Sequence, residues 1–410
     1  MRFSSLFLDK SLTDAVEALG YERPTPVQAQ AIPEILEGKD VMAGAQTGTG
    51  KTAAFALPIL QLLLKHTQSL RPIRALVLTP TRELAQQVFN SFVAYAENTQ
   101  LNVAVAYGGV SINPQIAAIE QGVDVLVATL GRLLDHIAKG SVDVSQLQVI
   151  VFDEADRMLD MGFKDEINRI LKRLPEQRQT LLFSATFDDA IFRMSKTLLI
   201  NPVLIEVNER NAAATQIEQL FYTVDKDRKR ELTSFLIGSK NWQQVLIFTR
   251  TKQTADALAK EMCKDGIKTE SIHGDKSQGA RERALAEFKQ GKVRALVATD
   301  VAARGIDIID LQYVINYELP FVAEDYIHRI GRTGRAGNTG LAVSLMSPNE
   351  KYLLDAVEKV LGAALISQWL PGYEPDLSKQ NQAEKRSNTG KQRKQARNKA
   401  LGIKMGRKRR

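Results

Sequence analysis

Short runs of four to six mostly apolar residues recur along this 410-residue chain, and longer segments with helical spacing separate them. The runs lack apolar/polar alternation, which is typical of strands buried on both faces, as in parallel sheets covered by helices. They lie at 75–78, 123–128, 149–152 and 180–183 in the first half, and at 245–248, 295–298, 313–316 and 341–345 in the second. Strand, helix and strand in succession, twice over, predict an α/β protein with two parallel-sheet domains.

Composition agrees with this prediction and excludes several other classes. A chain of this length exceeds one core of typical size, and 44% hydrophobic with 25% charged residues is ordinary for a globular protein. Its 13 Pro and 26 Gly are too few for a collagen-like or wholly disordered chain, and no apolar stretch reaches the roughly 18–20 residues of a membrane span. The single Cys263 cannot form an internal disulfide, and Asp9 interrupts what would be the apolar part of a signal peptide. We therefore expect a cytoplasmic protein with no membrane partner.

Charge is distributed unevenly along the chain. Residues 379–410 hold 13 Lys and Arg against one acid, a charge of +12, so the remainder carries −4 of the net +8. This segment has almost no apolar side chains, and we expect it to be disordered. It can anchor phosphate backbones, although a solubilising tail or a localisation signal would look alike. We place the domains at 1–207 and 218–370, a polar linker at 208–217 and the basic tail at 371–410.

A segment rich in glycine and threonine runs from Ala45 to Thr52, between a short apolar run and a helix-compatible segment. It matches the P-loop pattern, with Ala45 where the pattern has Gly. Gly48 and Gly50 let backbone N–H groups converge on phosphate oxygens at a helix N-terminus. Lys51 can reach the β- and γ-phosphates, and the Thr52 hydroxyl can bind Mg²⁺. The alternative is a turn without a ligand.

Acidic residues follow the buried run 149–152 directly: Asp153, Glu154 and Asp156. A carboxylate at the end of a hydrophobic strand is costly unless it is paired or faces a cation. We expect Asp153 to hold Mg²⁺, directly or through water, and Glu154 to polarise the water that attacks the γ-phosphate. An acidic helix cap would explain one of these carboxylates but not two.

These segments, in this order, resemble the DEAD-box family of RNA helicases, whose name spells residues 153–156. The resemblance extends from about Phe3 to about Gly340. It implies two tandem RecA-like domains, ATP and Mg²⁺ as cofactors, and RNA bound through its backbone without sequence preference. The implied activity is that of an ATP-dependent RNA helicase, which hydrolyses ATP and locally unwinds short RNA duplexes.

Upstream of the P-loop, Phe3 and the stretch from Gly20 to Gln28 resemble the family's Q motif, in which the glutamine recognises adenine. The stretch from Asp300 to Asp307 resembles the motif whose last acid contacts the ribose. The resemblance thus implies that the nucleotide is bound by Phe3, Tyr21, Arg23, Gln28, Gln46, Thr47, Gly48, Thr49, Gly50, Lys51, Thr52 and Asp307.

The arginines of the stretch 328–335 recur at every third position, so Arg332 and Arg335 can point the same way. Planar guanidinium groups suit the spread charge of a transferring phosphoryl group. The resemblance implies that these two act as arginine fingers beside Lys51 and Glu154; a salt-bridge cluster without phosphate is the alternative. It also implies that Asp156, Ser184, Thr186, Arg304 and His328 couple the nucleotide site to domain closure.

Segments after other strands resemble the family's RNA-backbone contacts. The positions concerned are Pro80, Thr81, Arg82, Gly108, Gly109, Thr129, Gly131, Arg132, Gln278, Arg281, Thr299 and Asp300. Small residues and helix N-termini let backbone N–H groups approach phosphates, while Arg adds charge. Leu130 departs from the Pro that is usual in the family. Aromatic residues are not interleaved with the basic ones, so we expect contacts to the RNA backbone to predominate over base stacking.

The stretch from Pro371 to Pro375 resembles the bacterial RhlE-type subgroup, which implies a role in ribosome assembly or RNA turnover and partners among ribosomal precursors or the RNA-turnover machinery. We expect a monomer. Two alternatives remain at this stage: a DNA helicase or translocase on the same two-domain motor, and an ATP-gated RNA clamp without catalysis.

Overall fold

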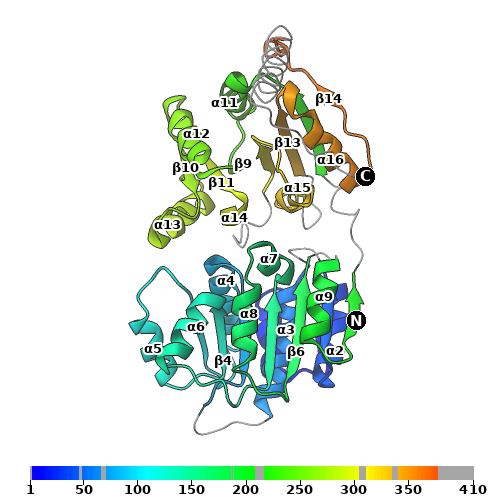
Figure 1. Ribbon diagram of the computed structural model, residues 1–410, viewed down its shortest axis with the longest axis vertical. Coiled ribbons are helices and arrows are strands. Elements are labelled where there is room, and N and C mark those ends of the chain that lie inside the picture. The colour runs from blue at the N-terminus through cyan, green and yellow to red at the C-terminus, as the bar shows by residue number, and fades with distance from the viewer. Residues whose placement is uncertain are drawn as a thin grey trace, which may run out of the picture.

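Two parallel sheets form the frame of the computed structural model (Figure 1). It describes residues 2–45, 49–65, 71–185, 187, 189–207, 217–303, 311–334 and 340–376. The first sheet contains β1 (Val41–Gly44), β2 (Ala75–Thr79), β3 (Val103–Ala106), β4 (Val125–Thr129), β5 (Val149–Asp153), β6 (Gln179–Ser184) and β7 (Val203–Glu206). The second contains β8 (Ile217–Thr223), β9 (Val245–Thr249), β10 (Thr269–Ile272), β11 (Ala295–Thr299), β12 (Tyr313–Asn316), β13 (Gly340–Met346) and β14 (Ser367–Gln368).

The two sheets share one topology. The first has the order β3-β4-β2-β5-β6-β1-β7, and the second has the order β10-β11-β9-β12-β13-β8-β14. Counting the strands of the second sheet from β8 reproduces the order of the first, and the neighbouring strands pair in parallel in both. The second domain is therefore a topological repeat of the first, which confirms the predicted pair of RecA-like domains.

Helices cover both faces of each sheet. In the first domain η1 (Phe3–Leu6), α1 (Lys10–Ala18), α2 (Pro26–Leu36), α3 (Lys51–Leu64) and α4 (Arg82–Tyr95) share one core, and α6 (Leu130–Lys139), α7 (Ala155–Asp160), α8 (Lys164–Leu171) and α9 (Asp189–Leu198) share the other; α5 is Asn113–Glu120. In the second domain α11 (Lys229–Ser239) and α12 (Lys252–Lys264) cover one face, and α13 (Gln278–Lys289), α14 (Asp300–Ala303), α15 (Ala323–Ile330) and α16 (Lys351–Leu361) the other; η2 is Lys226–Arg228 and η3 is Pro348–Glu350.

The central strands are apolar because both of their faces are covered. In β5, for example, Val149 and Val151 belong to one core, while Ile150 and Phe152 belong to the other. The predicted strands all form. Those that the apolar runs did not predict are β3, β7, β8, β10 and β14, and four of these five lie at sheet edges. The edge strand β10 reads Thr-Glu-Ser-Ile and so gives no apolar run, whereas β3 is short and apolar but only half-buried.

The last described segment, residues 362–376, packs along the second domain. Its strand β14 pairs with β8, and the Tyr373 ring lies 5.5 Å from that of Phe235 and beneath the guanidinium group of Arg228. The fold of this domain therefore extends beyond residue 370.

Of the expected linker and tail, residues 208–216 and 377–410 lie outside the described residues, and the domain boundaries stay predictions. In the described part of the chain no helix combines the length and apolar character that crossing a bilayer requires.

Candidate nucleotide and RNA site

Most of the predicted site residues follow the carboxyl ends of parallel strands, the edge at which open α/β sheets bind ligands; Phe3, Tyr21, Arg23 and Gln28 precede β1. In the N-terminal domain this edge carries α4 and α7, and it faces the end of the C-terminal domain that carries α13, α14 and α15 (Figure 1). The strands thus bring residues that lie far apart in the sequence to two opposed edges. The site is described below from the P-loop outward.

The described part of the P-loop positions one lysine at a helix N-terminus. Gly50 is the N-cap of α3 with a φ of 88°, a left-handed conformation that glycine adopts without strain. Lys51 begins the helix; it is 7% exposed, and its Nζ donates to the carbonyl oxygen of Ala45 at 2.7 Å. Thr52 follows in the first helical turn. Gln46, Thr47 and Gly48 lie outside the described residues, so their predicted phosphate contacts stay predictions.

Two adjacent carboxylates end β5, and both are buried. Asp153 is 3% exposed; burial and, next in weight, the neighbouring charge of Glu154 raise its pKa to about 7, although the Lys51 ammonium opposes the shift. A divalent cation bound to the Asp153 carboxylate would stabilise its charged form and so oppose the effects of burial and of Glu154 on its pKa. Within the described residues no cluster of three or more His, Cys, Asp or Glu could hold a metal. The carboxylate of Asp153 and the hydroxyl of Thr52 offer oxygen ligands that fit Mg²⁺, which binds through few protein groups and keeps its remaining ligands as water and phosphate.

Glu154 occupies a strained backbone position. Its φ and ψ of 56° and 53° lie in the left-handed region, which costs a non-glycine residue of the order of 1–3 kcal/mol. Its carboxylate accepts a hydrogen bond from Arg157 in the next turn of α7. Strain of this kind persists where the surrounding structure enforces it and clusters at active sites. The backbone geometry is thus compatible with the predicted role of Glu154 as the base.

The predicted adenine-binding residues connect to the P-loop. The Oε1 of Gln28 accepts from the Thr25 N–H at 2.9 Å, and its Nε2 donates to the Gly50 carbonyl oxygen at 3.0 Å. Both amide atoms are therefore bound to main chain in this structure. Phe3 and Tyr21 stack with ring centroids 6.5 Å apart. Arg23 lies exposed nearby in sequence.

One hydrogen bond joins the acidic segment to the next strand. Asp156 accepts from the Ala185 N–H at 3.2 Å, directly after β6, and so brings two of the predicted coupling segments together. Ser184 is buried, and its carbonyl oxygen accepts from Ala45 N–H at the start of the P-loop. Thr186 lies outside the described residues.

Several predicted RNA contacts hold one another in place. Thr81 caps α4 by accepting from the Leu84 N–H, and a Cβ at Gly109 would overlap the guanidinium group of Arg82, which also lies near Gly108. The glycine pair thus gives Arg82 room to cross the loop. Pro80 is buried and Thr129 ends β4 partly exposed.

Arg132 supports this loop from the other side. It is 9% exposed and donates to the Gln115 side chain at 3.0 Å and to the Val110 carbonyl oxygen at 2.9 Å. Gly131 beside it is exposed, whereas Leu130 is 1% exposed and packs in the core shared with α8 and α9. Burial of the larger side chain accounts physically for a leucine at this position.

Glu83 joins the two domains, a contact that the sequence did not reveal. Its carboxylate lies 2.8 Å from Arg281 Nη2 and accepts from Gln278 Nε2 at 3.3 Å. The Glu83 and Arg281 side chains are 8% and 9% exposed. Gln278 and Arg281 were predicted to contact RNA; here they hold α13 against α4, and RNA contact by either stays a prediction.

One of the two predicted finger arginines of the second domain is described. Arg332 is 4% exposed just after α15, and His328 lies within that helix. Arg304, Asp307 and Arg335 lie outside the described residues. Thr299 ends β11 nearly buried, and Asp300 binds Arg329, a residue that the sequence did not single out, through contacts of 2.6 and 2.7 Å.

Comparisons with known proteins agree with this geometry. The chain matches the family model "DEAD/DEAH box helicase" over residues 25–194 and "Helicase conserved C-terminal domain" over residues 227–337. It is 42% identical to the ATP-dependent RNA helicase CshA of Listeria monocytogenes over 358 residues, which are 87% of this chain and 68% of that protein. The chain belongs to the DEAD-box helicase family.

Two further similarities extend over both domains. The DEAD-box ATP-dependent RNA helicase RhpA of Helicobacter pylori is 42% identical over 364 residues, 88% of this chain and 73% of that protein. The structure of S. cerevisiae Dbp5 bound to RNA and ADP BeF3 is 31% identical with a TM-score of 0.81, and the match covers 91% of this chain and 95% of that one. Because one superposition spans both domains, their arrangement in this DEAD-box helicase is similar to that of the RNA-bound protein.

Proposed function

We propose that this chain is an ATP-dependent RNA helicase that closes its two domains on ATP and on an RNA backbone, hydrolyses the ATP and locally unwinds short duplexes. The observation that carries the proposal is the contact of Glu83 with Arg281, because it brings the two motif-bearing edges together. With the two edges facing each other, we assign Arg332 to the same site as Lys51, Asp153 and Glu154, and this assignment stays part of the proposal. Family membership supports the same activity.

The residues divide the chemistry between the domains. Lys51 binds the phosphates, Thr52 and Asp153 would hold Mg²⁺, which neutralises phosphate charge, and Glu154 accepts a proton from the attacking water. Arg332 and Arg335 stabilise the charge that spreads over the transferring phosphoryl group. Because these arginines come from the other domain, hydrolysis depends on closure, and ATP favours the closed form through its differential contacts with that form.

RNA is bound chiefly through its phosphates. The N-terminus of α4 at Thr81, the crossing of Arg82 over Gly108 and Gly109, and the exposed Gly131 at the start of α6 provide backbone donors and one cation on the same edge of the domain. Contacts of this kind do not distinguish sequences. Discrimination of RNA from DNA then depends on 2′-hydroxyl groups.

The finer assignment rests on the C-terminal segment. The stretch from Pro371 to Pro375, which packs at Tyr373 against Phe235, supports assignment to the RhlE-type subgroup. We extend the proposal to a cytoplasmic monomer that acts in ribosome assembly or RNA turnover, with the basic tail as an additional RNA anchor.

The deciding experiment compares ATP hydrolysis with single-stranded RNA and with DNA of the same sequence, together with the separation of a short RNA duplex. We expect strong stimulation by RNA, weak stimulation by DNA, and strand separation that needs ATP. Equal stimulation by the two would indicate a general nucleic-acid translocase. ATP-dependent RNA binding without turnover would indicate a clamp.

A further inference from the structure

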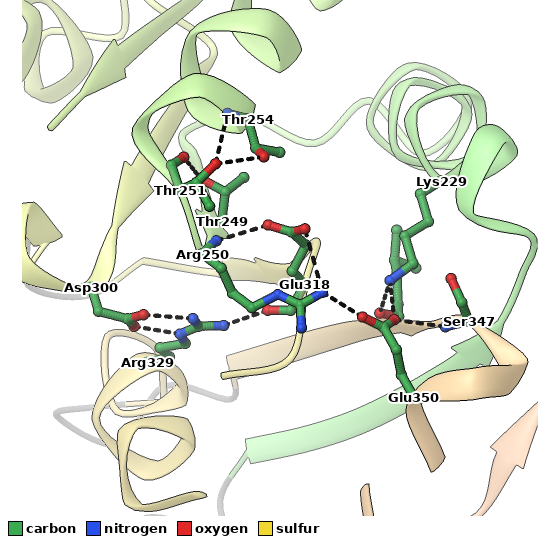
Figure 2. Close-up of polar contacts among 11 residues, drawn as sticks. Lys229, Thr249, Arg250, Thr251, Thr254, Asp300, Glu318, Arg329, Ser347 and Glu350 are labelled. Atoms are coloured by element: carbon green, nitrogen blue, oxygen red, sulfur yellow. Dashed lines mark hydrogen bonds and ion pairs between the residues drawn. The ribbon is translucent and has the colours of Figure 1, made fainter. Parts of the chain in front are cut away.

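A row of charged side chains crosses the second domain from α11 to α15 (Figure 2). It alternates in sign, and its members in order are Lys229, Glu350, Arg250, Glu318, Arg329 and Asp300. Three cations balance three anions. The side chains are 3, 11, 16, 13, 1 and 21% exposed, so the row is mostly shielded from water.

Glu350 connects two cations at one end of the row. Its Oε2 accepts from Lys229 Nζ at 2.7 Å and from the Ser347 N–H at 3.0 Å, while its Oε1 contacts Arg250 Nη2 at 2.5 Å. Lys229 also donates to the Leu345 carbonyl oxygen at 3.0 Å. The carboxylate is thereby held from three directions at the start of α16.

Glu318 is held at both its side chain and its main chain. The carboxylate accepts from the Arg250 N–H at 2.8 Å and contacts Arg250 Nη2 at 3.4 Å. Its carbonyl oxygen accepts from Arg329 Nη1 at 2.6 Å. Arg250 itself packs over the Phe321 ring at 4.6 Å, on the same loop. The conformation of the loop after β12 therefore depends on Arg250.

Arg329 links the loop that carries Glu318 to Arg332, the predicted arginine finger. It forms a two-pronged pair with Asp300, the first residue after β11, and its own carbonyl oxygen accepts from the Arg332 N–H at 3.2 Å. Arg329 thus fixes the last turn of α15, where the predicted arginine finger begins.

From these contacts we infer that Glu350 and Arg250 are positioning residues for ATP hydrolysis. They hold the loop that carries Glu318, and this loop, together with Asp300, sets the position of Arg329 and hence of Arg332. The inference assigns neither residue a contact with the nucleotide. The inference rests on the proposed function, since it gives the row a role only if Arg332 serves phosphoryl transfer.

Stability alone does not explain the row. Burying an ion pair usually gains little over packing apolar side chains of similar volume, because removing both charges from water is costly. A buried pair does fix geometry, since its hydrogen bonds are directional. The row ends at Asp300, itself one of the predicted RNA contacts, and at Arg329, three residues before the predicted finger Arg332, so its geometry bears on the site.

The first test is the Glu350→Gln variant in the full-length protein. We expect kcat for RNA-stimulated ATP hydrolysis to fall about tenfold while KM for ATP stays within twofold. A misplaced Arg332 would stabilise the transition state less, whereas the binding of ATP in the ground state would be unchanged. The matched control is Glu261→Gln, which removes the same charge from an exposed pair with Lys264 on α12. A folded Glu350→Gln protein with the kcat of the wild type would overturn the inference.

The second test separates positioning from simple charge balance and also serves if the single variant folds poorly. The double variant Lys229→Met with Glu350→Leu removes both buried charges and should restore the melting temperature. Arg250 then keeps its contact with Glu318 but still lacks the one with Glu350, so we expect kcat to remain about tenfold low. Recovery of kcat together with the melting temperature would show that Glu350 serves only to neutralise Lys229. If the wild-type protein shows no RNA-stimulated hydrolysis, the proposed function has failed before this inference is tested.

Discussion

The two domains share a strand order but differ in how they balance charge at their facing edges. In the second domain, the buried Glu350 and the partly buried Asp300 and Glu318 each contact a cation. In the first, Asp153 is buried beside Glu154, and its pKa is raised because its burial and its neighbour outweigh Lys51. Glu154 is paired with Arg157, so the first domain has one buried carboxylate, Asp153, whose charge is not fully balanced and which suits Mg²⁺. The second has a preset arrangement of arginines.

The largest expected effect concerns the first domain. Glu154→Gln keeps the shape of the side chain but removes its ability to accept a proton, so we expect ATP hydrolysis to fall by about 10²- to 10⁴-fold. RNA-stimulated phosphate release measures it, and the exposed Glu97→Gln on the same domain is the control. ATP-dependent RNA binding should persist, since the P-loop is intact. Normal turnover by Glu154→Gln would show that another group is the base.

The second prediction tests the unbalanced charge directly. Because the pKa of Asp153 is about 7 in the folded protein and about 3.8 as an unperturbed side chain, its ionisation opposes folding increasingly between pH 4 and pH 7, and by a constant amount above that. Without Mg²⁺ and nucleotide, Asp153→Asn should therefore be more stable than the wild type at pH 8, by about 2–4 kcal/mol. Denaturant unfolding at pH 4 and pH 8 measures this difference.

The comparison at pH 4 is an internal control, because Asp153 is largely protonated in the folded state there and its ionisation costs little, so the two proteins should be nearly equal. Adding Mg²⁺ at pH 8 should stabilise the wild type and leave Asp153→Asn almost unchanged. A wild type that is the more stable protein at pH 8 without Mg²⁺ would contradict the account of this pocket.

The third prediction concerns the contact between the two edges. Glu83→Gln or Arg281→Met removes an ion pair that joins the domains, so we expect RNA-stimulated kcat/KM to fall about tenfold while ATP affinity without RNA is unchanged. The charge exchange Glu83→Arg with Arg281→Glu should recover part of the loss. No recovery, together with a shallower salt dependence of RNA binding in Arg281→Met, would assign Arg281 to RNA instead.

The same contrast explains what the sequence could and could not reveal. Local patterns made parts of the fold and site predictable. The central strands are continuous apolar runs, Lys51 stands in a P-loop pattern at a helix start, and Asp153 and Glu154 follow a buried strand. The contact of Glu83 was not predictable, because an acid in the first turn of a helix also serves the helix dipole, and its partner Arg281 lies 198 residues later. Arg329 resembles its neighbours in the arginine repeat, and only tertiary packing shows that it is the one bound to Asp300.

Deleting the basic tail should have the smallest effect on catalysis. The tail carries excess positive charge, whereas the site at Asp153 carries excess negative charge. Residues 379–410 carry +12 while the rest of the chain carries −4, so deleting them should weaken RNA affinity severalfold at low salt and flatten its dependence on salt, since fewer counterions are released on binding. Basal ATP hydrolysis should change little, because the residues predicted to bind the nucleotide lie in the two domains. A tail of equal length with every Lys and Arg replaced by Gln is the matched control and should behave like the deletion. Unchanged affinity at low salt for both would exclude the anchor role and leave RNA binding to the domain edges alone.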